Sequence, residues 1–247
     1  MKRHPAYLQA LTNFNQVLSV SKASLLELKK AIGDTCPPAK VIQLGADYSG
    51  IKEGNTCLRK ERLEQLGQKV SALMVGIVEP RKNQLAALEA QRILAEQGIT
   101  LELTIVGRLN DHFGEAIKQK IEKQIREGYP CRYVGAVADS QLDELYTQAD
   151  VLLFPSIVEG FGLPPFEALA RGVPCISHRL PSVFEFLEDA PIIWCDAPTG
   201  ESLAKGISRF ANDLEFRKNF PEKAQSFHLP KWKDTALQIA EITGLSE

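Results

Sequence analysis

The chain has 247 residues, of which 44% are hydrophobic and 24% charged, and these are the proportions of an ordinary globular protein. Such a composition excludes a disordered, collagen-like or fibrous protein. The 29 Lys and Arg residues nearly balance the 31 Asp and Glu residues, so the net charge of −2 offers no basic surplus for a general nucleic-acid partner.

The first 47 residues are predicted to form one β-α-β unit, with strands at 16–20 and 40–44. Ser24 and Glu27 have the spacing of a capping box and indicate a helix start between the two strands. This unit is too small to bury a core of its own. Residues 45–55 are polar and contain glycine, a composition typical of a linker to a second unit.

From residue 71 to residue 194, short apolar runs alternate with segments of helical periodicity. Asp139 is expected to cap one of these helices, and the chain from Ser202 onward shows a helical pattern only. The runs are apolar throughout, so we expect helices on both faces of the sheet. Repeated β-α units of this kind predict an α/β fold, with a doubly wound, parallel, Rossmann-like sheet. The predicted strands are 71–77, 101–106, 131–134, 151–154, 173–177 and 192–194.

The loop after the strand at 151–154 is the most informative stretch of the chain. It runs through Gly160 and Gly162 into a helix, and Pro164 suits the first turn of that helix. Ligands of open α/β sheets bind beyond the carboxyl ends of the strands, where this loop lies. A helix start also offers free N–H groups, which favour a phosphate.

Two carboxylates flank this expected anion site, Glu159 before the loop and Glu167 within the helix. They suit the site if they accept hydrogen bonds from hydroxyl groups, such as those of a sugar and a ribose. From the residues alone a second interpretation stays open. Glu167 and Arg171 are four residues apart and can form an ordinary surface ion pair, while Glu159 can be solvated.

The segment 159–167 resembles the E-x7-E signature of the retaining family 4 glycosyltransferases, which have the GT-B fold. The resemblance extends to E-G-F-G-L-P-P-x-E-A and to the R-G-V-P that follows, and it covers nearly the whole chain. Further similar segments, in the same order as in the family, are 19–22, 42–47, 75–83, 105–107, 133–135, 145–150 and 181–185.

The resemblance implies a role for individual residues. Glu159 and Lys82 are the implied catalytic residues, with Glu159 near the transferred sugar and Lys82 on the diphosphate. Glu167 would bind the ribose hydroxyls, and backbone N–H groups of the loop would contact the sugar and diphosphate. Many relatives carry Arg where this chain has Ile77, so one diphosphate contact is missing or is supplied by Arg81. The implied donor-binding residues are Arg81, Lys82, Gly160, Phe161, Gly162, Leu163 and Glu167.

The resemblance also implies the substrates and the domain plan. The donor would be a UDP- or GDP-sugar, and a hexosyl unit would pass with retention to a saccharide or a glycolipid, without a cofactor or metal. Residues 1–47 would be the end of an N-terminal acceptor domain, 48–230 the nucleotide-sugar-binding domain and 231–247 a C-terminal cross-over helix. An acceptor-domain chain or self-association could complete such a protein.

Two alternatives to this enzyme are considered. The chain could be a catalytically incomplete nucleotide-sugar-binding subunit or fragment of a split glycosyltransferase. The chain could also be a nucleotide-sugar epimerase of related architecture, although the loop sequence favours this function less.

Other patterns predict no further site and favour the cytoplasm as the location. The pair Cys175 and His178 lies in an apolar strand, and His112 with Glu115 has no third metal ligand. Five widely spaced cysteines without a CxxC motif favour reduced thiols in the cytoplasm. We expect no signal peptide or membrane-spanning helix, and any membrane contact would be peripheral, through the acceptor domain.

Overall fold

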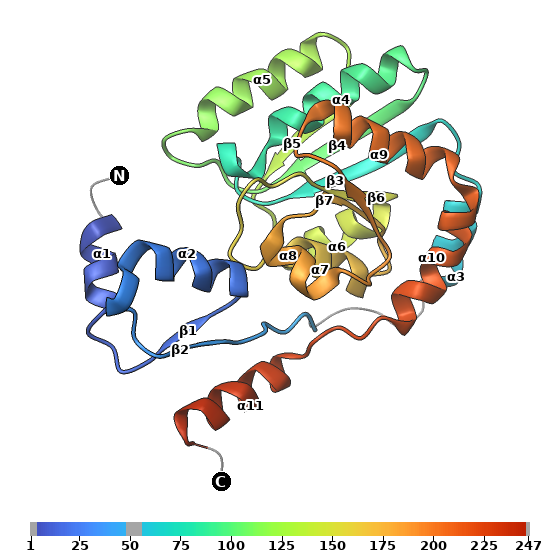
Figure 1. Ribbon diagram of the computed structural model, residues 1–247. Coiled ribbons are helices and arrows are strands. Elements are labelled where there is room, and N and C mark those ends of the chain that lie inside the picture. Colours follow the sequence, from blue (N-terminus) through green and yellow to red (C-terminus); the bar gives the residue numbers. More distant parts are fainter. Residues whose placement is uncertain (1–3, 48–55, 246–247) are drawn as a thin grey trace.

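A computed structural model describes residues 4–47 and 56–245, and most of the predicted linker, 48–55, lies outside the described residues. The chain forms a six-stranded, wholly parallel sheet of order β5-β4-β3-β6-β7-β8 and a separate two-stranded parallel sheet, β1-β2 (Figure 1). The strands are β1 Val17–Ser19, β2 Ala39–Val41, β3 Lys69–Val75, β4 Thr100–Val106, β5 Cys131–Gly135, β6 Val151–Phe154, β7 Cys175–His178 and β8 Ile192–Cys195.

Helices cover the large sheet on both faces. Helices α4, α5 and α9 lie on one face, and α6, α7 and α8 lie on the other (Figure 1). The α-helices are α1 His4–Leu11, α2 Lys22–Ile32, α3 Thr56–Glu64, α4 Gln84–Glu96, α5 Gly114–Arg126, α6 Asp139–Gln148, α7 Leu163–Ala170, α8 Pro181–Leu187, α9 Gly200–Asn212, α10 Leu214–Ser226 and α11 Trp232–Thr243. The 3₁₀ helices are η1 Gly33–Thr35 and η2 Pro80–Lys82.

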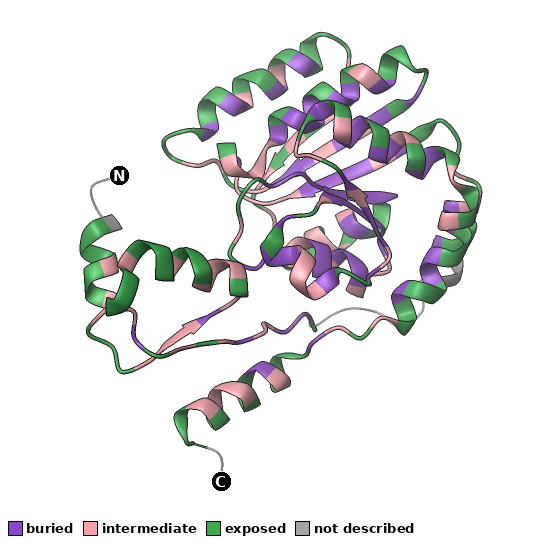
Figure 2. Cartoon of the chain, in the orientation of Figure 1, coloured by how far each residue is buried: buried purple, intermediate pink, exposed green. Residues whose placement is uncertain are grey.

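The core of the molecule lies at the centre of this sheet, as Figure 2 shows. Every residue of β6 is buried, because β6 is flanked by strands on both sides and by helices on both faces. The prediction that all runs are apolar and doubly covered is wrong for β5. This edge strand alternates half-buried and exposed residues, and a cavity opens beside its Cys131 and Arg132.

Two local predictions also need correction. Ser21, not Ser24, caps α2: its hydroxyl accepts a hydrogen bond from the Ser24 N–H at 3.0 Å, and Glu27 forms an ion pair with Lys30 instead. Asp139 is the first residue of α6 rather than its cap, and Gln141 accepts the Ala138 N–H. The helix α3 was not predicted, because its sequence is mostly charged and polar.

The N-terminal unit and the last helix lie together. The backbone N–H of Gln43 donates to Gln238 of α11 at 3.1 Å, and Thr235 of α11 donates to the Gln43 carbonyl at 2.7 Å. The N-terminal segment and α11 thus share a small contact layer away from the large sheet (Figure 1). The division at residues 47 and 230 stays a prediction.

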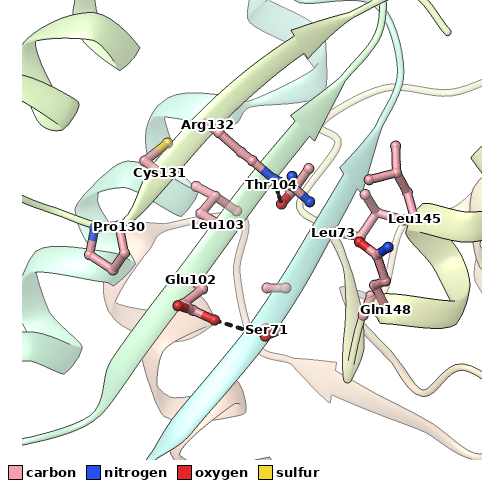
Figure 3. A pocket seen from close by; sticks show the side chains of 12 residues that line it. Ser71, Leu73, Glu102, Leu103, Thr104, Pro130, Cys131, Arg132, Leu145 and Gln148 are labelled. Carbon is pink, nitrogen blue, oxygen red and sulfur yellow. Dashed lines mark hydrogen bonds between the residues drawn. The ribbon is translucent and has the colours of Figure 1, made fainter. Parts of the chain in front are cut away.

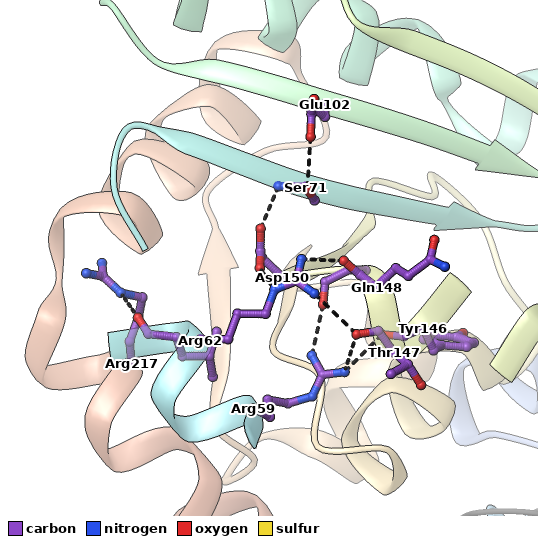
Figure 4. A network of polar contacts seen from close by, with 11 residues as sticks. Arg59, Arg62, Ser71, Glu102, Tyr146, Thr147, Gln148, Asp150 and Arg217 are labelled. Atoms are coloured by element: carbon purple, nitrogen blue, oxygen red, sulfur yellow. Dashed lines mark hydrogen bonds and ion pairs between the residues drawn. The ribbon is translucent and has the colours of Figure 1, made fainter. Parts of the chain in front are cut away.

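Two arginines of α3 bind carbonyls at the end of α6. Arg59 of α3 is 8% exposed and donates to the carbonyls of Tyr146, Thr147 and Ala149 at the end of α6 (Figure 4). Arg62 adds an ion pair of 2.6 Å to Asp150. Such cationic caps neutralise the negative ends of helix dipoles and fix α3 to α6.

Candidate functional site

The candidate site lies at the carboxyl ends of β3 and β6. These two strands are neighbours in the sheet, and the strand order reverses between them, so they form the topological switch point at which open α/β sheets bind ligands. The loop after β3 contains η2, and the loop after β6 leads into α7. The backbone N–H of Ile157 donates to the Arg81 carbonyl at 2.8 Å, so the two loops are joined directly.

Lys82, Arg81 and Glu159 meet in this site, as the sequence predicted for a cationic pair beside the glutamate loop. The Lys82 ammonium lies 2.5 Å from Glu159 Oε1, and the Arg81 guanidinium lies 2.7 Å from Glu159 Oε2. Arg81 also pairs with Glu79. The Lys82 and Glu159 side chains are 11% and 7% exposed, whereas Arg81 is 41% exposed. Two cations and two carboxylates therefore balance each other in a largely buried cluster.

Gly76, directly after β3, makes room for the Lys82 side chain. It has φ of +144°, and a Cβ added there would lie 3.1 Å from Lys82 Cε. The Lys82 ammonium lies 5.5 Å from the ring centre of Phe154, the last residue of β6. The sheet therefore holds the lysine head between its two central strand ends, next to the aromatic ring.

Asn83 is a positioning residue that the sequence analysis did not single out. It is the one non-glycine residue with positive φ in the described part of the chain, at φ 56° and ψ 42°. Its side-chain amide donates to the Pro155 carbonyl at 3.1 Å and to the Pro198 carbonyl at 2.7 Å. Asn83 thus ties the loop after β3 to the loops after β6 and β8. An Asn directly before a helix is the only sequence signal of this role.

The turn into α7 presents unpaired backbone N–H groups. Among the described residues, none accepts a hydrogen bond from the N–H groups of Phe161, Gly162 or Leu163. Pro164 and Pro165 follow and have no N–H, so the donors of this helix start are concentrated in the turn. This is the arrangement that favours an anion. The Phe161 side chain points into the core, where it stacks on Phe166 with 4.7 Å between ring centres.

Gly162 is required by packing as well as by conformation. It has φ of +85°, and a Cβ there would lie 2.6 Å from Val183 Cγ2. Gly160, in contrast, would place a Cβ 3.5 Å from Val20, which is ordinary contact. The Gly160 carbonyl accepts a hydrogen bond from Ser24 of α2 at 3.1 Å, so the N-terminal unit touches the glycine loop.

Glu167 belongs to a second group of side chains, one that joins α6 to α7. Its Oε2 accepts a hydrogen bond from the Tyr146 hydroxyl at 2.9 Å. Arg171 places its guanidinium 4.8 Å from the Tyr146 ring centre and pairs with Asp143 at 2.6 Å. Burial, followed by the Glu167 charge, raises the pKa of Tyr146 well above its ordinary value, so the phenol stays a donor. The alternative interpretation, an ordinary surface pair of Glu167 and Arg171, is therefore incomplete. Tyr146 binds the Glu167 carboxylate and Asp143 pairs with Arg171, and neither partner was predicted from the sequence.

Glu185, in the α8 segment whose sequence resembles the family's later glutamate turn, contacts the N-terminal unit. Its two carboxylate oxygens accept the Lys22 N–H of α2 at 2.9 and 3.2 Å. Desolvation raises the pKa of Glu185 above its ordinary value, while the hydrogen bond from Lys22 opposes this shift. A carboxylate at a helix N-terminus stabilises the helix dipole, so α8 and α2 are held together there.

The minor candidates from the sequence do not join this site. Cys175 is fully buried in β7, and burial raises the pKa of its thiol. His178 Nε2 lies 2.6 Å from the Ser156 carbonyl, so the pair does not form a nucleophile and base. Within residues 4–47 and 56–245 there is no group of three or more His, Cys, Asp or Glu able to hold a metal ion, and no helix long and apolar enough to cross a membrane. The prediction of metal-free chemistry is not tested by these observations.

A cavity of about 410 Å³ lies away from the site, over β3, β4 and β5. Figure 3 shows Glu102, Thr104 and Arg132 on this face, with Gln148 of α6 beside it. The Ser71 hydroxyl donates to Glu102 at 3.2 Å, and the Arg132 guanidinium donates to Thr104 at 2.8 Å. These pairs satisfy polar side chains of the cavity without a ligand. The cavity also accounts for the partial exposure of β5.

Solved structures identify the fold of this chain. HepE from Anabaena, solved with UDP and glucose, superposes on 98% of this chain with a TM-score of 0.78 at 20% identity, and 66% of that chain is matched. Sucrose-phosphate synthase from Thermosynechococcus elongatus superposes on 99% of this chain and 61% of its own, with a TM-score of 0.73 at 22% identity. The fold is that of the GT-B glycosyltransferases, as predicted.

The particular family follows from the sequence. The family described as "Glycosyl transferases group 1" matches residues 58–227, and the chain belongs to this family of transferase enzymes. The O-antigen chain mannosyltransferase B of Escherichia coli is 34% identical over 211 residues, which are 85% of this chain and 55% of the relative. The O-antigen chain mannosyltransferase RfbU of Salmonella typhimurium is 26% identical over 174 residues, 67% of this chain and 46% of the relative. The chain thus spans about half the length of these relatives.

Proposed function

We propose that this chain is the donor-binding part of a retaining glycosyltransferase, which transfers a hexosyl unit from a nucleotide-sugar to a saccharide or lipid-linked acceptor. The observation that carries the proposal is the Lys82–Arg81–Glu159 cluster at the switch point of the sheet. The relatives named as mannosyltransferases favour mannose as the transferred sugar and a polysaccharide as the product.

The chemistry follows from where charge develops. When the bond between the anomeric carbon and the diphosphate oxygen breaks, negative charge grows on the nucleoside diphosphate and positive charge on the sugar ring. Lys82 and Arg81 would stabilise the leaving diphosphate, together with the free N–H groups of Phe161, Gly162 and Leu163. Glu159, once its cations turn to the diphosphate, would face the positive sugar ring. No metal or cofactor is needed, because the chain supplies these cations itself.

Arg81 would compensate for Ile77. Ile77 offers no charged group, but Arg81 lies beside Lys82 and is held between Glu79 and Glu159. Because Arg81 is the more exposed of the two cations, its guanidinium can turn toward a bound diphosphate with little desolvation.

A second function is favoured by a different observation. In the described part of the chain the N-terminal unit has a two-stranded sheet, and it contacts α11 through hydrogen bonds of Gln43 with Gln238 and Thr235. The chain could therefore bind the nucleotide-sugar without turning it over, as an incomplete subunit of a split enzyme that acts with an acceptor-domain chain or a second copy. The free cysteines among the described residues favour a cytoplasmic location for either function.

Thermal denaturation in the presence of UDP, GDP, ADP and their glucose and mannose conjugates tests the donor class. A nucleotide present at about 100 times its Kd should add about 2.7 kcal/mol to the free energy of unfolding. If one series stabilises the chain, incubation with its sugar conjugate and a polysaccharide acceptor separates the two functions. Release of nucleoside diphosphate with an α-linked product from an α-linked donor supports the retaining transferase, whereas binding without release supports the subunit. No stabilisation by any nucleotide contradicts both.

A further inference from the structure

Tyr146 makes a contact for which the sequence assigns no function. Its side chain is fully buried, and its hydroxyl donates to Glu167 Oε2 across the gap between α6 and α7 at 2.9 Å. Since the phenol is neutral and the carboxylate can only accept, the direction of this hydrogen bond is fixed by chemistry. One oxygen of Glu167 is therefore always engaged from the protein side.

The Tyr146 ring itself is held in place. Arg171 lies over the ring at 4.8 Å and is fixed by Asp143, whose Oδ1 accepts from Arg171 Nε at 2.9 Å and Nη2 at 2.6 Å. Asp143 and Tyr146 come from α6, while Arg171 and Glu167 come from the α7 segment. Two contacts in parallel thus set the spacing of the two segments, and the phenol cannot swing away from Glu167.

A carboxylate needs such a restraint if it is to select a diol. The terminal torsion of a Glu side chain is broad, so an unrestrained carboxylate samples many orientations. With Oε2 held by Tyr146, the carboxylate samples fewer orientations, and its remaining acceptor positions point in a narrower range of directions. Two neighbouring hydroxyls can then be met at once, at a smaller loss of conformational freedom on binding.

We infer that Tyr146 is a positioning residue that orients Glu167 toward the two hydroxyls of a ribose and so makes the site selective for ribonucleotides. This inference rests on the proposed function, because it takes Glu167 as the ribose ligand. It adds a residue from a different helix to the site and assigns a specificity to it. The high pKa of the phenol agrees, since the hydroxyl keeps its proton over the whole physiological pH range.

The test is a calorimetric titration of the full chain with UDP, GDP and their 2′-deoxy counterparts. The variant is Tyr146→Phe, which removes one oxygen atom and keeps the ring. The matched control is Tyr129→Phe, because Tyr129 also carries an arginine over its ring, Arg92 at 5.9 Å. Wild type and control should bind the ribonucleotide at least about tenfold more tightly than the deoxynucleotide. In Tyr146→Phe the ribonucleotide should bind about tenfold more weakly and the deoxynucleotide less than twofold more weakly, so the preference is largely lost.

The outcomes separate the possible failures. An unchanged preference in Tyr146→Phe overturns the inference, even if both nucleotides bind more weakly, because a purely structural role lowers both alike. A wild type that binds no nucleotide overturns the proposed function and this inference with it. If Tyr146→Phe does not fold, Asp143→Ala takes its place, because it removes the carboxylate that fixes Arg171 over the Tyr146 ring from the α6 side. A preference unchanged in that variant likewise overturns the inference, and a reduced one supports it.

Discussion

The Lys82 ammonium is paired with the Glu159 carboxylate in a position where both side chains are about nine-tenths buried. Arg81 shares the same carboxylate and also pairs with Glu79, so both cations that we propose for the diphosphate are already paired. On the proposed function, binding of a nucleotide would exchange these ion pairs for pairs with the diphosphate. Glu159 would then compete with the diphosphate for Lys82 and Arg81.

The first prediction concerns this exchange. Glu159→Gln keeps the side chain's shape and removes the charge that competes for Lys82 and Arg81. We expect the affinity for free nucleoside diphosphate to rise by about three- to tenfold, with a steeper salt dependence, because two cations become available. Calorimetry at two salt concentrations measures this, with Glu127→Gln as control, since Glu127 pairs with Arg92 on the surface. A weaker affinity in Glu159→Gln would show that Glu159 does not compete with the diphosphate.

The second prediction separates the two glycines of the loop. Gly162→Ala should lower the free energy of unfolding by about 2–4 kcal/mol, because the positive φ and the clash with Val183 add together. Gly160→Ala should change it by less than about 1 kcal/mol, since a Cβ there meets only ordinary contacts. Urea denaturation of both variants measures the difference, and equal losses would be inconsistent with the described turn.

The third prediction concerns Arg59. Arg59→Met should lower the free energy of unfolding by about 2–4 kcal/mol, because the carbonyls of Tyr146 and Ala149 lose their buried donor. Lys60→Met is the control, as Lys60 is the next residue and is exposed. Burial lowers the pKa of Arg59 to about 10, so the charge persists at neutral pH. A loss no larger than that of the control would mean that α3 is not fixed through this side chain.

The fourth prediction is a pH dependence. The pKa of Glu185 is raised in the folded protein, so between its ordinary value of 4.5 and the raised value the folded state binds more protons than the unfolded state. In that window stability falls as pH rises, and the contribution of Glu185 is greatest at low pH. Glu185→Gln lacks this titration. The melting temperature of wild type relative to Glu185→Gln should therefore decline as pH rises from 4.5. A relative rise would show that the pKa of Glu185 is lowered in the folded protein, not raised.

Part of this structure could be predicted from the sequence, and part could not. The six-stranded sheet and the loop at 159–163 follow from local patterns, since apolar runs and glycine-proline turns act over a few residues. The bond between Tyr146 and Glu167 joins two helices, and Arg59 contacts carbonyls 87 to 90 residues away. These contacts between distant residues depend on how the helices pack against one another, and the spacing of apolar residues along the sequence does not predict that packing.

Two of the wrong predictions, the cap of α2 and the double covering of β5, also have physical causes. Ser21 and Ser24 are both acceptable caps three residues apart, and the backbone is extended at Ser21, which is therefore the cap. The edge position of β5 follows from strand order, and a short apolar run does not reveal it.

The most direct test of the account is a calorimetric titration of the chain with GDP and UDP, beside Lys82→Met. Lys118→Met is the control, because Lys118 lies on α5 and forms long ion pairs with Glu115 and Glu122, at 4.0 and 3.6 Å. The account predicts that wild type and control bind one nucleoside diphosphate equally, and that Lys82→Met binds it at least about tenfold more weakly while remaining folded. Equal binding by all three proteins would contradict the assignment of the diphosphate site to Lys82 and the cluster around it.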